Sequence, residues 1–438
     1  MLLRFGCENF RSFSTYQEIL FTATPRKDDN EGFVLSSNAI RENVLPIIAL
    51  YGANGSGKTN FLRALNFFKK FICQSAKKDL EGTYIPTFKL NNEQIENEQT
   101  FDIDFITDGL HYHYGFVILG DEVVEEWLFS YTYVNRSSKT TLFHRDEREN
   151  DVYQFGKNLK GQNKNIAKMT SKHSLFLSVA AKLDHELLSI IQKYFLLEYN
   201  FRFSIDINEE SIADKIVRFK LQNELSEYLS QVQIGSHHLE ISEVEIDDVH
   251  IEMRDKLKTA LQEMIQSDEL EFEGMSKKYE NKIHLHRKDS SGALIPFSFS
   301  DESLGTKALI SLLVAILRTL KTGGILIVDE IESSLHTLLT LKLVELFSNS
   351  ETNPNQAQLI FSTHETQLLS FQGVRRDQIW FAERCVNGAS HIAPLTDYKV
   401  PKESNLRNGY INGKFGGIPY LKNFNLSSLF KEDSHGKS

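Results

Sequence analysis

Short apolar runs that end in polar or charged residues recur along this chain of 438 residues. The clearest runs lie at 45–50, 325–328 and 359–361. An unbroken apolar run of this length predicts a strand buried on both faces, as in a parallel sheet covered by helices. Apolar and polar residues alternate instead at 101–105 and 112–119, which predicts strands with one exposed face. The pattern therefore indicates an α/β fold with a mostly parallel core sheet and an antiparallel β subdomain.

Helical periodicity dominates two other regions. The stretch 308–320 carries an apolar stripe, and the chain turns helical between about 175 and 275, most clearly at 187–191 and 212–229. Apolar positions there keep no heptad long enough for a long coiled coil. We expect a short helical insert, an arm or lid, between two halves of one sheet that resumes near residue 283.

A glycine-rich loop follows the first buried run. Residues 52–59 spell G-x-x-x-x-G-K-T and lead into a helix-like segment. Glycine lets the backbone curl so that successive N–H groups face a phosphate at a helix N-terminus, where free donors and the macrodipole favour negative charge. Lys58 is expected to reach the β- and γ-phosphates and Thr59 to ligate Mg²⁺. The loop predicts a nucleoside triphosphate site with contacts from Asn54, Gly55, Ser56, Gly57, Lys58 and Thr59.

Two acidic residues end the second buried run. Asp329 and Glu330 follow 325–328, at the carboxyl end of the expected strand. In a phosphoryl-transfer site Asp329 would hold the metal, directly or through water, and Glu330 would polarise the attacking water. Alone, the pair is equally compatible with a strand that runs into an acidic turn. Together with the phosphate loop it predicts hydrolysis.

The third apolar run and a polar loop each supply a further candidate for contact with a phosphate. His364 follows 359–363 and can donate a hydrogen bond to a phosphate oxygen or to the attacking water. A lone histidine after a strand is usually structural, and the neighbouring motifs are what make this one a candidate. Ser303 has the position of a helix cap before 308–320, and with Gly305 it offers a hydroxyl, a backbone N–H and a dipole end to a phosphate.

The order of these motifs resembles ATP-binding-cassette (ABC) ATPases: phosphate loop, serine–glycine signature, acidic strand, the segment 333–336, and a histidine after a strand. The order differs from that of hexameric AAA+ proteins. The segment 9–13, Asn-Phe-Arg-Ser-Phe, is similar to the SMC and RecF branch. Closer still is the resemblance to the overcoming-lysogenization-defect and abortive-infection ATPases (AAA15), which include ATPase subunits of the phage-defence systems Septu and PARIS. The matching segments are 303–306, 329–336, 362–365, 376–381 and 409–419.

The resemblance implies a fold, ligands and partners. It implies an ABC-type P-loop ATPase head that clamps ATP and Mg²⁺ in a homodimer or a higher homo-oligomer, so that Ser303 and Gly305 act on the partner copy's nucleotide. It adds Arg11 to the nucleotide contacts. The chain after His364 is too short for the nuclease domain of full-length overcoming-lysogenization-defect proteins. We therefore expect a regulatory ATPase of anti-phage defence that controls a separate effector, a nuclease in the first instance.

Three alternatives stay open. One is a DNA-repair ATPase of the RecF or SMC type, which has the same motifs. Another is a transporter ATPase, which the helical insert and the segment 9–13 disfavour. The third is a scaffold that binds ATP without hydrolysing it, and the intact Glu330 argues against it.

The chain departs from the family pattern at two points. Thr337 stands where the family usually has proline, a change we expect to be confined to one helix start. No glutamine can be assigned as the metal-sensing residue, because Gln74, Gln94 and Gln99 all lie in the plausible window and surface glutamine is the simplest interpretation of each.

The motifs divide the chain into five expected segments. They are the first half of the head with the phosphate loop (1–130), a β-hairpin and basic loop (131–174), the helical insert (175–282), the second half of the head (283–400) and a C-terminal tail (401–438).

Charge bears on the possible partners. The chain has 49 basic and 59 acidic residues, a net charge of −10 that repels phosphate backbones at long range. The region 136–172 is locally basic, which keeps nucleic-acid contact possible, although such runs are usually solvated surface.

Other composition features exclude several classes of protein. The three cysteines lack C-x-x-C spacing, so neither a disulfide framework nor a zinc site is indicated. The histidine pairs at 111/113 and 284/286 could suggest metal ligands, but the alternation of side chains along a strand explains their spacing. No apolar run approaches the ~20 residues that span a bilayer, and no signal peptide is evident. We expect a cytoplasmic protein without a membrane partner.

Overall fold

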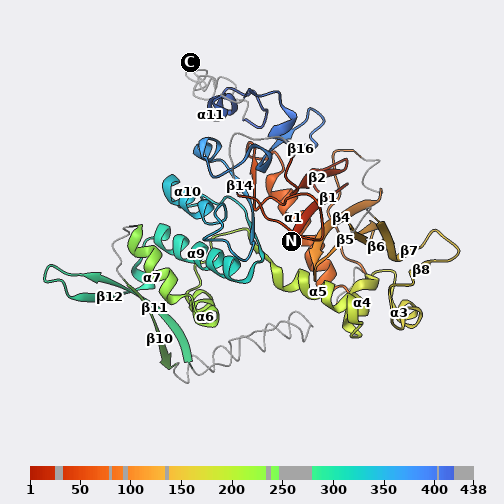
Figure 1. Cartoon of the computed structure of the whole chain (residues 1–438), viewed down its shortest axis with the longest axis horizontal. Helices are drawn as coiled ribbons and strands as arrows, with labels where there is room; N and C mark the ends of the chain where they lie inside the picture. Colours follow the sequence, from red (N-terminus) through yellow and green to blue (C-terminus); the bar gives the residue numbers. More distant parts are fainter. Residues whose placement is uncertain are drawn as a thin grey trace, which may run out of the picture.

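The computed structural model describes residues 1–24, 33–77, 81–91, 97–133, 138–232, 238–245, 279–401 and 404–418. Within these ranges the strands form three sheets, of six, seven and three strands (Figure 1). No helix in the described ranges is both long and apolar enough to cross a bilayer.

The six-stranded sheet forms the centre of the fold, with strand order β16-β15-β3-β14-β13-β9. Its pairs are parallel except for β15 with β16. The mostly parallel core sheet predicted from the apolar runs is therefore confirmed. The strands are β3 (Ile47–Tyr51), β9 (Tyr199–Arg202), β13 (Ile325–Val328), β14 (Gln358–Thr363), β15 (Ile379–Arg384) and β16 (Ser390–Pro394).

Helices cover both faces of this sheet, which is why the three apolar runs are unbroken. Successive residues of β3 point to opposite faces. Ile48 packs in one hydrophobic cluster with helix α1 (Lys58–Gln74), whereas Ile47 packs in another with helix α9 (Leu304–Thr322). A strand buried on both sides has no solvent face that would need polar residues.

The seven-stranded sheet is antiparallel, with order β2-β1-β4-β5-β6-β7-β8. Its strands β4 and β5 contain the two alternating segments of the sequence and pair directly. One face packs on α1 through aromatic rings, as in the stacked pair Phe68 and Phe116, whose centroids are 5.2 Å apart. The strands are β1 (Leu2–Cys7), β2 (Gln17–Leu20), β4 (Gln99–Thr107), β5 (Leu110–Leu119), β6 (Glu122–Thr132), β7 (Ser138–Asp146) and β8 (Tyr153–Phe155).

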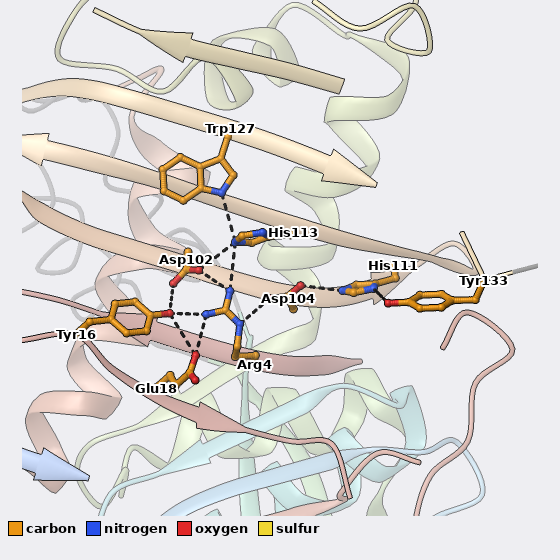
Figure 2. A network of polar contacts seen from close by, with 9 residues as sticks. All are labelled: Arg4, Tyr16, Glu18, Asp102, Asp104, His111, His113, Trp127 and Tyr133. Carbon is orange, nitrogen blue, oxygen red and sulfur yellow. Dashed lines mark hydrogen bonds and ion pairs between the residues drawn. The ribbon is translucent and has the colours of Figure 1, made fainter. Parts of the chain in front are cut away.

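The other face of this sheet carries a polar network centred on Arg4 (Figure 2). The guanidinium of Arg4 bonds Asp104 at 2.7 Å and Asp102 at 2.5 Å. His113 lies 3.0 Å from Asp102, and His111 lies 2.8 Å from Asp104. Burial alone raises the pKa of Asp102, but hydrogen bonds from His113 and Arg4 outweigh it and bring the pKa below its ordinary value. The network ties β1, β4 and β5 together.

The remaining elements join and flank the two large sheets. Strands β10, β11 and β12 form the three-stranded sheet, which packs on α6 and α7 and lies at the opposite end of the molecule from the seven-stranded sheet (Figure 1). These elements are α3 (Asn163–Met169), α4 (Phe176–Lys182), α5 (Glu186–Glu198), α6 (Glu209–Phe219), α7 (Gln222–Gln231), β10 (His238–Glu245), β11 (Tyr279–Lys288), β12 (Leu294–Ser298), α10 (Thr337–Glu345) and α11 (Leu406–Ile411).

The expected insert at 175–282 contains strands as well as the predicted helices. Helices α4 to α7 lie there, but so do β10 and the start of β11, which pair with each other, and β9, which pairs with β13 as the edge of the core sheet. Its four residues, Tyr-Asn-Phe-Arg, follow α5 directly and form no apolar run, so neither a turn nor a pattern marks the strand. Residues 246–278 of the insert lie outside the described residues. The division into five segments remains a prediction.

Candidate functional site

The phosphate loop connects β3 to α1, and glycine determines its shape. Gly57 caps α1 with φ of 114°, a conformation that L side chains rarely adopt. A Cβ at Gly57 would lie 2.3 Å from Ser390 Oγ, so no other residue fits there. The first turn of an α-helix leaves its N–H groups without intrahelical acceptors, so those of α1 can serve a ligand. Among the described residues, the buried Oγ of Ser56 in the same loop has no hydrogen-bond partner.

Lys58 is held over this loop by backbone carbonyls. Its Nζ donates to the carbonyl oxygens of Gly52, at 2.7 Å, and Ala53, at 3.2 Å, and lies 3.1 Å from Nε2 of His364. Burial lowers the pKa of Lys58, against the opposing effect of Asp329. A phosphate at the loop would replace two neutral acceptors by charged ones, which make stronger hydrogen bonds with an ammonium group.

Thr59 and Asp329 meet although 270 positions separate them. Thr59 Oγ1 donates to Asp329 Oδ1 at 3.1 Å, and Ser362 Oγ donates to the same oxygen at 2.5 Å. Because β13 and β14 are parallel neighbours, their carboxyl ends lie at the same edge of the sheet as the loop after β3. A hydroxyl beside a carboxylate is the oxygen donor set that Mg²⁺ prefers. These residues fit the predicted metal site.

Glu330 has an unusual backbone conformation. Its φ is 52°, in the left-handed region that non-glycine residues rarely adopt. Its N–H donates to Ser362 Oγ at 2.8 Å, and the N–H of Ile331 donates to the Ser362 carbonyl at 3.1 Å. The side chain is exposed at the edge of the sheet. Strained backbone that its surroundings hold in place is typical of functional sites.

His364 follows β14, where the sequence placed it. Its N–H donates to Glu332 Oε1 at 2.6 Å, and Thr363 Oγ1 donates to Glu332 Oε2 at 2.8 Å. Burial, and next the charge of Lys58, lower the pKa of His364. Sequence reasoning missed Glu332 as the residue that holds this loop. The signal was present, since Glu332 follows the acidic pair by two positions.

The signature residues Ser303 and Gly305 lie apart from the phosphate loop of their own chain. Ser303 Oγ caps α9 by accepting from the N–H of Thr306 at 3.2 Å, and the side chain is exposed. A Cβ at Gly305 would lie 3.2 Å from the Ser334 carbonyl, so the start of α9 rests on the segment after the acidic pair. In the described part of the chain, no hydrogen bond joins Ser303 to residues 52–59. Thr337 is the first residue of α10, as expected.

Arg11 lies near the site without touching the phosphate loop through a hydrogen bond. Its φ is 54°, and its N–H donates to the Pro86 carbonyl at 3.0 Å. The next residue, Ser12, contacts the start of α1, because its Oγ accepts from Asn60 Nδ2 at 2.9 Å. The role of Arg11 remains a prediction.

The candidate glutamines do not reach the site where the structure describes them. Gln74 ends α1, a helix of 17 residues that is about 25 Å long and begins at Lys58. Gln99 starts β4 and donates to the Asn9 carbonyl at 2.8 Å. Gln94 lies outside the described residues. On the side of β13 away from β14, the neighbouring strand is β9, and its Arg202 carbonyl accepts from the N–H of Asp329 at 2.8 Å.

The segment 409–418 covers the outer side of the loop. Tyr410 packs on Tyr51 of β3, with ring centroids 5.6 Å apart, and donates to the Gly417 carbonyl at 3.1 Å. A cavity of about 700 Å³ lies between this segment and the phosphate loop, with His364 in its wall. The tail thus helps to shape the site, a role that the sequence pattern did not reveal.

Two arginines of the basic region at 136–172 are paired within the structure. The guanidinium of Arg145 is buried and donates to the Ser174 carbonyl at 2.8 Å, and Arg148 bonds Glu125 and Asp146. Arg136 lies outside the described residues. Ion pairs of this kind leave fewer free cations for a nucleic acid.

A parallel sheet whose central strand enters a phosphate loop, with acidic residues on the second strand along, defines a P-loop nucleotide-binding domain. Residues 47–370 match the profile of one protein family, described as "AAA domain, putative AbiEii toxin, Type IV TA system". The match covers nearly three quarters of the chain, and the protein belongs to this family of AAA ATPase domains. No protein of curated function matches the chain at a significant level.

Proposed function

We propose that the protein hydrolyses ATP in a Mg²⁺-dependent reaction. The observation that carries the proposal is the convergence of Lys58, Asp329 and His364 from three neighbouring parallel strands. Lys58 exchanges its carbonyl partners for the β- and γ-phosphates. Thr59 and Asp329 hold Mg²⁺, which neutralises charge on the phosphates when bound.

Glu330 and His364 act on the γ-phosphate side. The exposed carboxylate of Glu330 polarises the attacking water, and the strained backbone held by Ser362 fixes its direction. The imidazole of His364, released from Lys58 when that side chain turns to the phosphates, hydrogen-bonds a phosphate oxygen or the water.

Two substitutions separate binding from hydrolysis. Lys58→Ala removes contacts made in the ground state and is expected to abolish ATP binding. Glu330→Gln keeps the fold and the binding contacts, and turnover should fall roughly 10²- to 10⁴-fold, the usual contribution of a positioned base. Lys70→Ala, on the exposed side of the same helix α1, is the matched control. Equal turnover by wild type and Glu330→Gln would reject the assignment of Glu330.

We propose further that the domain is of the ABC type, in the SMC/RecF-like branch and the AAA15 group, and that two copies close around ATP. The exposed Ser303, away from its own phosphate loop, supports a role in trans. In a two-fold dimer each such contact occurs twice. Each phosphate loop would then face the start of the partner's α9. Hydrolysis would remove the γ-phosphate that favours the closed dimer, and the dimer would open.

The biological role that we propose is a sensor or regulatory ATPase of a prokaryotic anti-phage system. The family description, with its toxin and type IV toxin–antitoxin system, supports this context. In this proposal ATP-dependent closure controls a separately encoded effector, a nuclease in the first instance. A RecF- or SMC-like repair ATPase is the second candidate, because it would use the same site.

A further inference from the structure

A cavity of about 230 Å³ lies beside the acidic strand, on the side of the core sheet covered by α9. Strand β9 forms one wall, and helices α6 and α9 form the others. Three basic side chains line it: Arg202 from β9, Lys215 from α6 and Arg318 from α9. Asp206 is the acidic residue in the lining.

Two of the three cations lack a carboxylate partner within the described residues. Arg202 Nη1 donates to the carbonyl and to the Oγ of Ser311, both at 2.8 Å, and the guanidinium forms no ion pair with another described residue. The buried Nε of Arg318 has no hydrogen-bond partner among the described residues. Its guanidinium lies 4.7 Å from the centre of the Phe219 ring.

The nearby acids do not balance this charge. Asp206 already accepts from Lys215 Nζ at 3.4 Å. Asp206 acts on Arg202 and Glu198 acts on Arg318 without forming an ion pair among the described residues, and burial outweighs both acids and lowers the pKa of Arg202 and of Arg318. Guanidinium groups held in a cavity without a counter-charge are costly, and an oxyanion that accepts from both would offset this cost.

The cavity adjoins the catalytic acids. A second hollow, of about 70 Å³, is lined by Asp329 and Glu330, and it shares its wall with the first through Arg202, Phe203 and Ser204. Those three residues therefore separate the acidic pair from the basic cavity. The second hollow lies on the α9 side of the acidic strand, and Asp329 in its lining accepts a hydrogen bond from Thr59 at the end of the phosphate loop.

We propose that the basic cavity at β9 binds the inorganic phosphate released by ATP hydrolysis and provides its route out of the site. This inference rests on the proposed ATPase function. In hydrolysis the water oxygen bonds to the γ-phosphorus, the bond to the bridging oxygen breaks, and ADP leaves with that oxygen. One water proton leaves to solvent by way of the Glu330 carboxylate, and the other stays on the phosphate as HPO₄²⁻. The phosphate dianion passes the acidic pair, meets Arg202 at the shared wall and binds between Arg202, Arg318 and Lys215.

Phosphate binding tests the site without any turnover. The nucleotide-free Lys58→Ala protein, whose phosphate loop is disabled, is titrated with inorganic phosphate in a calorimeter. One site is expected. Adding Arg318→Gln should weaken it by at least about tenfold, the value of one hydrogen bond to a charged group. Lys193→Gln, an exposed basic residue on α5 that does not line the cavity, is the matched control and should leave the affinity unchanged.

Lys215→Gln tests the opposite wall of the cavity and should weaken phosphate several-fold even if the Arg318 variant folds poorly. The proposal would be overturned if no binding is seen at tens of millimolar phosphate. It would also be overturned if the Arg318 and Lys215 variants both bind phosphate as tightly as the Lys58→Ala parent. AMP that displaces phosphate and binds more tightly would assign the cavity to a nucleotide and overturn the product route. If wild type fails to hydrolyse ATP, the calorimetric result on the Lys58→Ala protein still decides whether the anion site exists.

Discussion

At the scale of single residues, hydrogen bonds from neighbouring side chains hold Asp329, Glu330 and His364 in place. Ser362 donates to the Asp329 carboxylate and accepts from the N–H of Glu330. Glu332 accepts from the N–H of His364. These hydrogen bonds fix side chains and backbone before substrate arrives, which is the preorganisation that electrostatic catalysis requires.

The histidine next to Lys58 should make stability depend on pH. Burial and the Lys58 charge lower the pKa of His364 below 6.5, so the unfolded chain takes up a proton at a pH where the folded chain does not. Between the two pKa values the free energy of unfolding rises with pH, and it falls as pH drops from about 7 toward the folded pKa. His364→Gln should remove this slope. The ring is partly exposed, so we expect an effect of only about 0.5 kcal/mol.

Urea denaturation of the nucleotide-free protein between pH 5 and about 7.5 measures this slope. His391→Gln, an exposed histidine on β16, serves as the control. Parallel pH profiles for wild type and His364→Gln would show that His364 is not perturbed in the folded state.

At the scale of elements, a strand residue performs the capping of a helix. Glu126 of β6 is fully buried, and its carboxylate accepts from the N–H groups of Phe176 at 2.6 Å and Leu177 at 3.0 Å at the start of α4. The residue at the N-cap position, Leu175, has no side-chain acceptor to offer. The charge also lies 3.9 Å from buried Arg145. This carboxylate fixes α4 against the seven-stranded sheet.

Glu126→Ala should therefore be strongly destabilising. It leaves the N–H groups of Phe176 and Leu177 and the hydroxyl of Tyr114 without an acceptor, whereas Arg145 keeps its ion pair with Glu147. We expect a loss of about 3–5 kcal/mol in the free energy of unfolding. Glu126→Gln, which keeps one acceptor oxygen, should lose less. Chemical denaturation measures the change, with the exposed Glu149→Ala as control. A loss below about 1 kcal/mol for Glu126→Ala would contradict this account of the α4 start.

The start of α9 carries the prediction for dimerisation. Ser303→Arg places a bulky cation where the proposed dimer would meet the partner's nucleotide, while the monomer's own phosphate loop is untouched. In the Glu330→Gln background with ATP, light scattering should show a dimer that Ser303→Arg abolishes, with ATP binding nearly unchanged. Glu351→Arg, exposed and remote, is the control. An undiminished dimer would remove the trans role of Ser303.

At the scale of the whole molecule, the site exists only when distant parts of the chain assemble. The central strand β3 lies between β14 and β15, so the phosphate loop is flanked by segments that follow it by about 300 residues. The segment 409–418 then closes over the loop from outside. A nucleotide that binds these segments together could close them around the site, and such a closure can regulate a bound partner protein.

Coexpression with the product of the adjacent gene tests the proposed defence role. We expect a copurifying complex, resistance to phage that is lost with Lys58→Ala, and little toxicity when this chain is expressed without its neighbour. The matched control is Lys70→Ala, which should keep resistance. No complex, together with resistance that is independent of Lys58, would leave the repair ATPase ahead. Toxicity of this chain alone would make it the effector itself.

Much of the core sheet and of the site was predictable because the relevant information is local. Each of the runs that became β3, β13 and β14 is apolar throughout, since both faces of each strand are covered. Residues 52–59 encode the loop in eight consecutive positions, because glycine and lysine at those spacings serve one backbone geometry. Asp329, Glu330 and His364 could be named because each lies within two positions of the end of a strand.

Tertiary structure alone decided which residues those groups meet. Strand β9 carries no pattern of its own and exists because the edge of β13 offers hydrogen bonds to pair with. Residues from separate elements meet in three places. Glu332 accepts from the N–H of His364, Glu126 caps α4, and the basic cavity adjoins the hollow that Glu330 lines. Burial periodicity records whether a side chain faces the core, but it does not record which neighbour it finds there. That choice depends on strand order and packing across the whole chain.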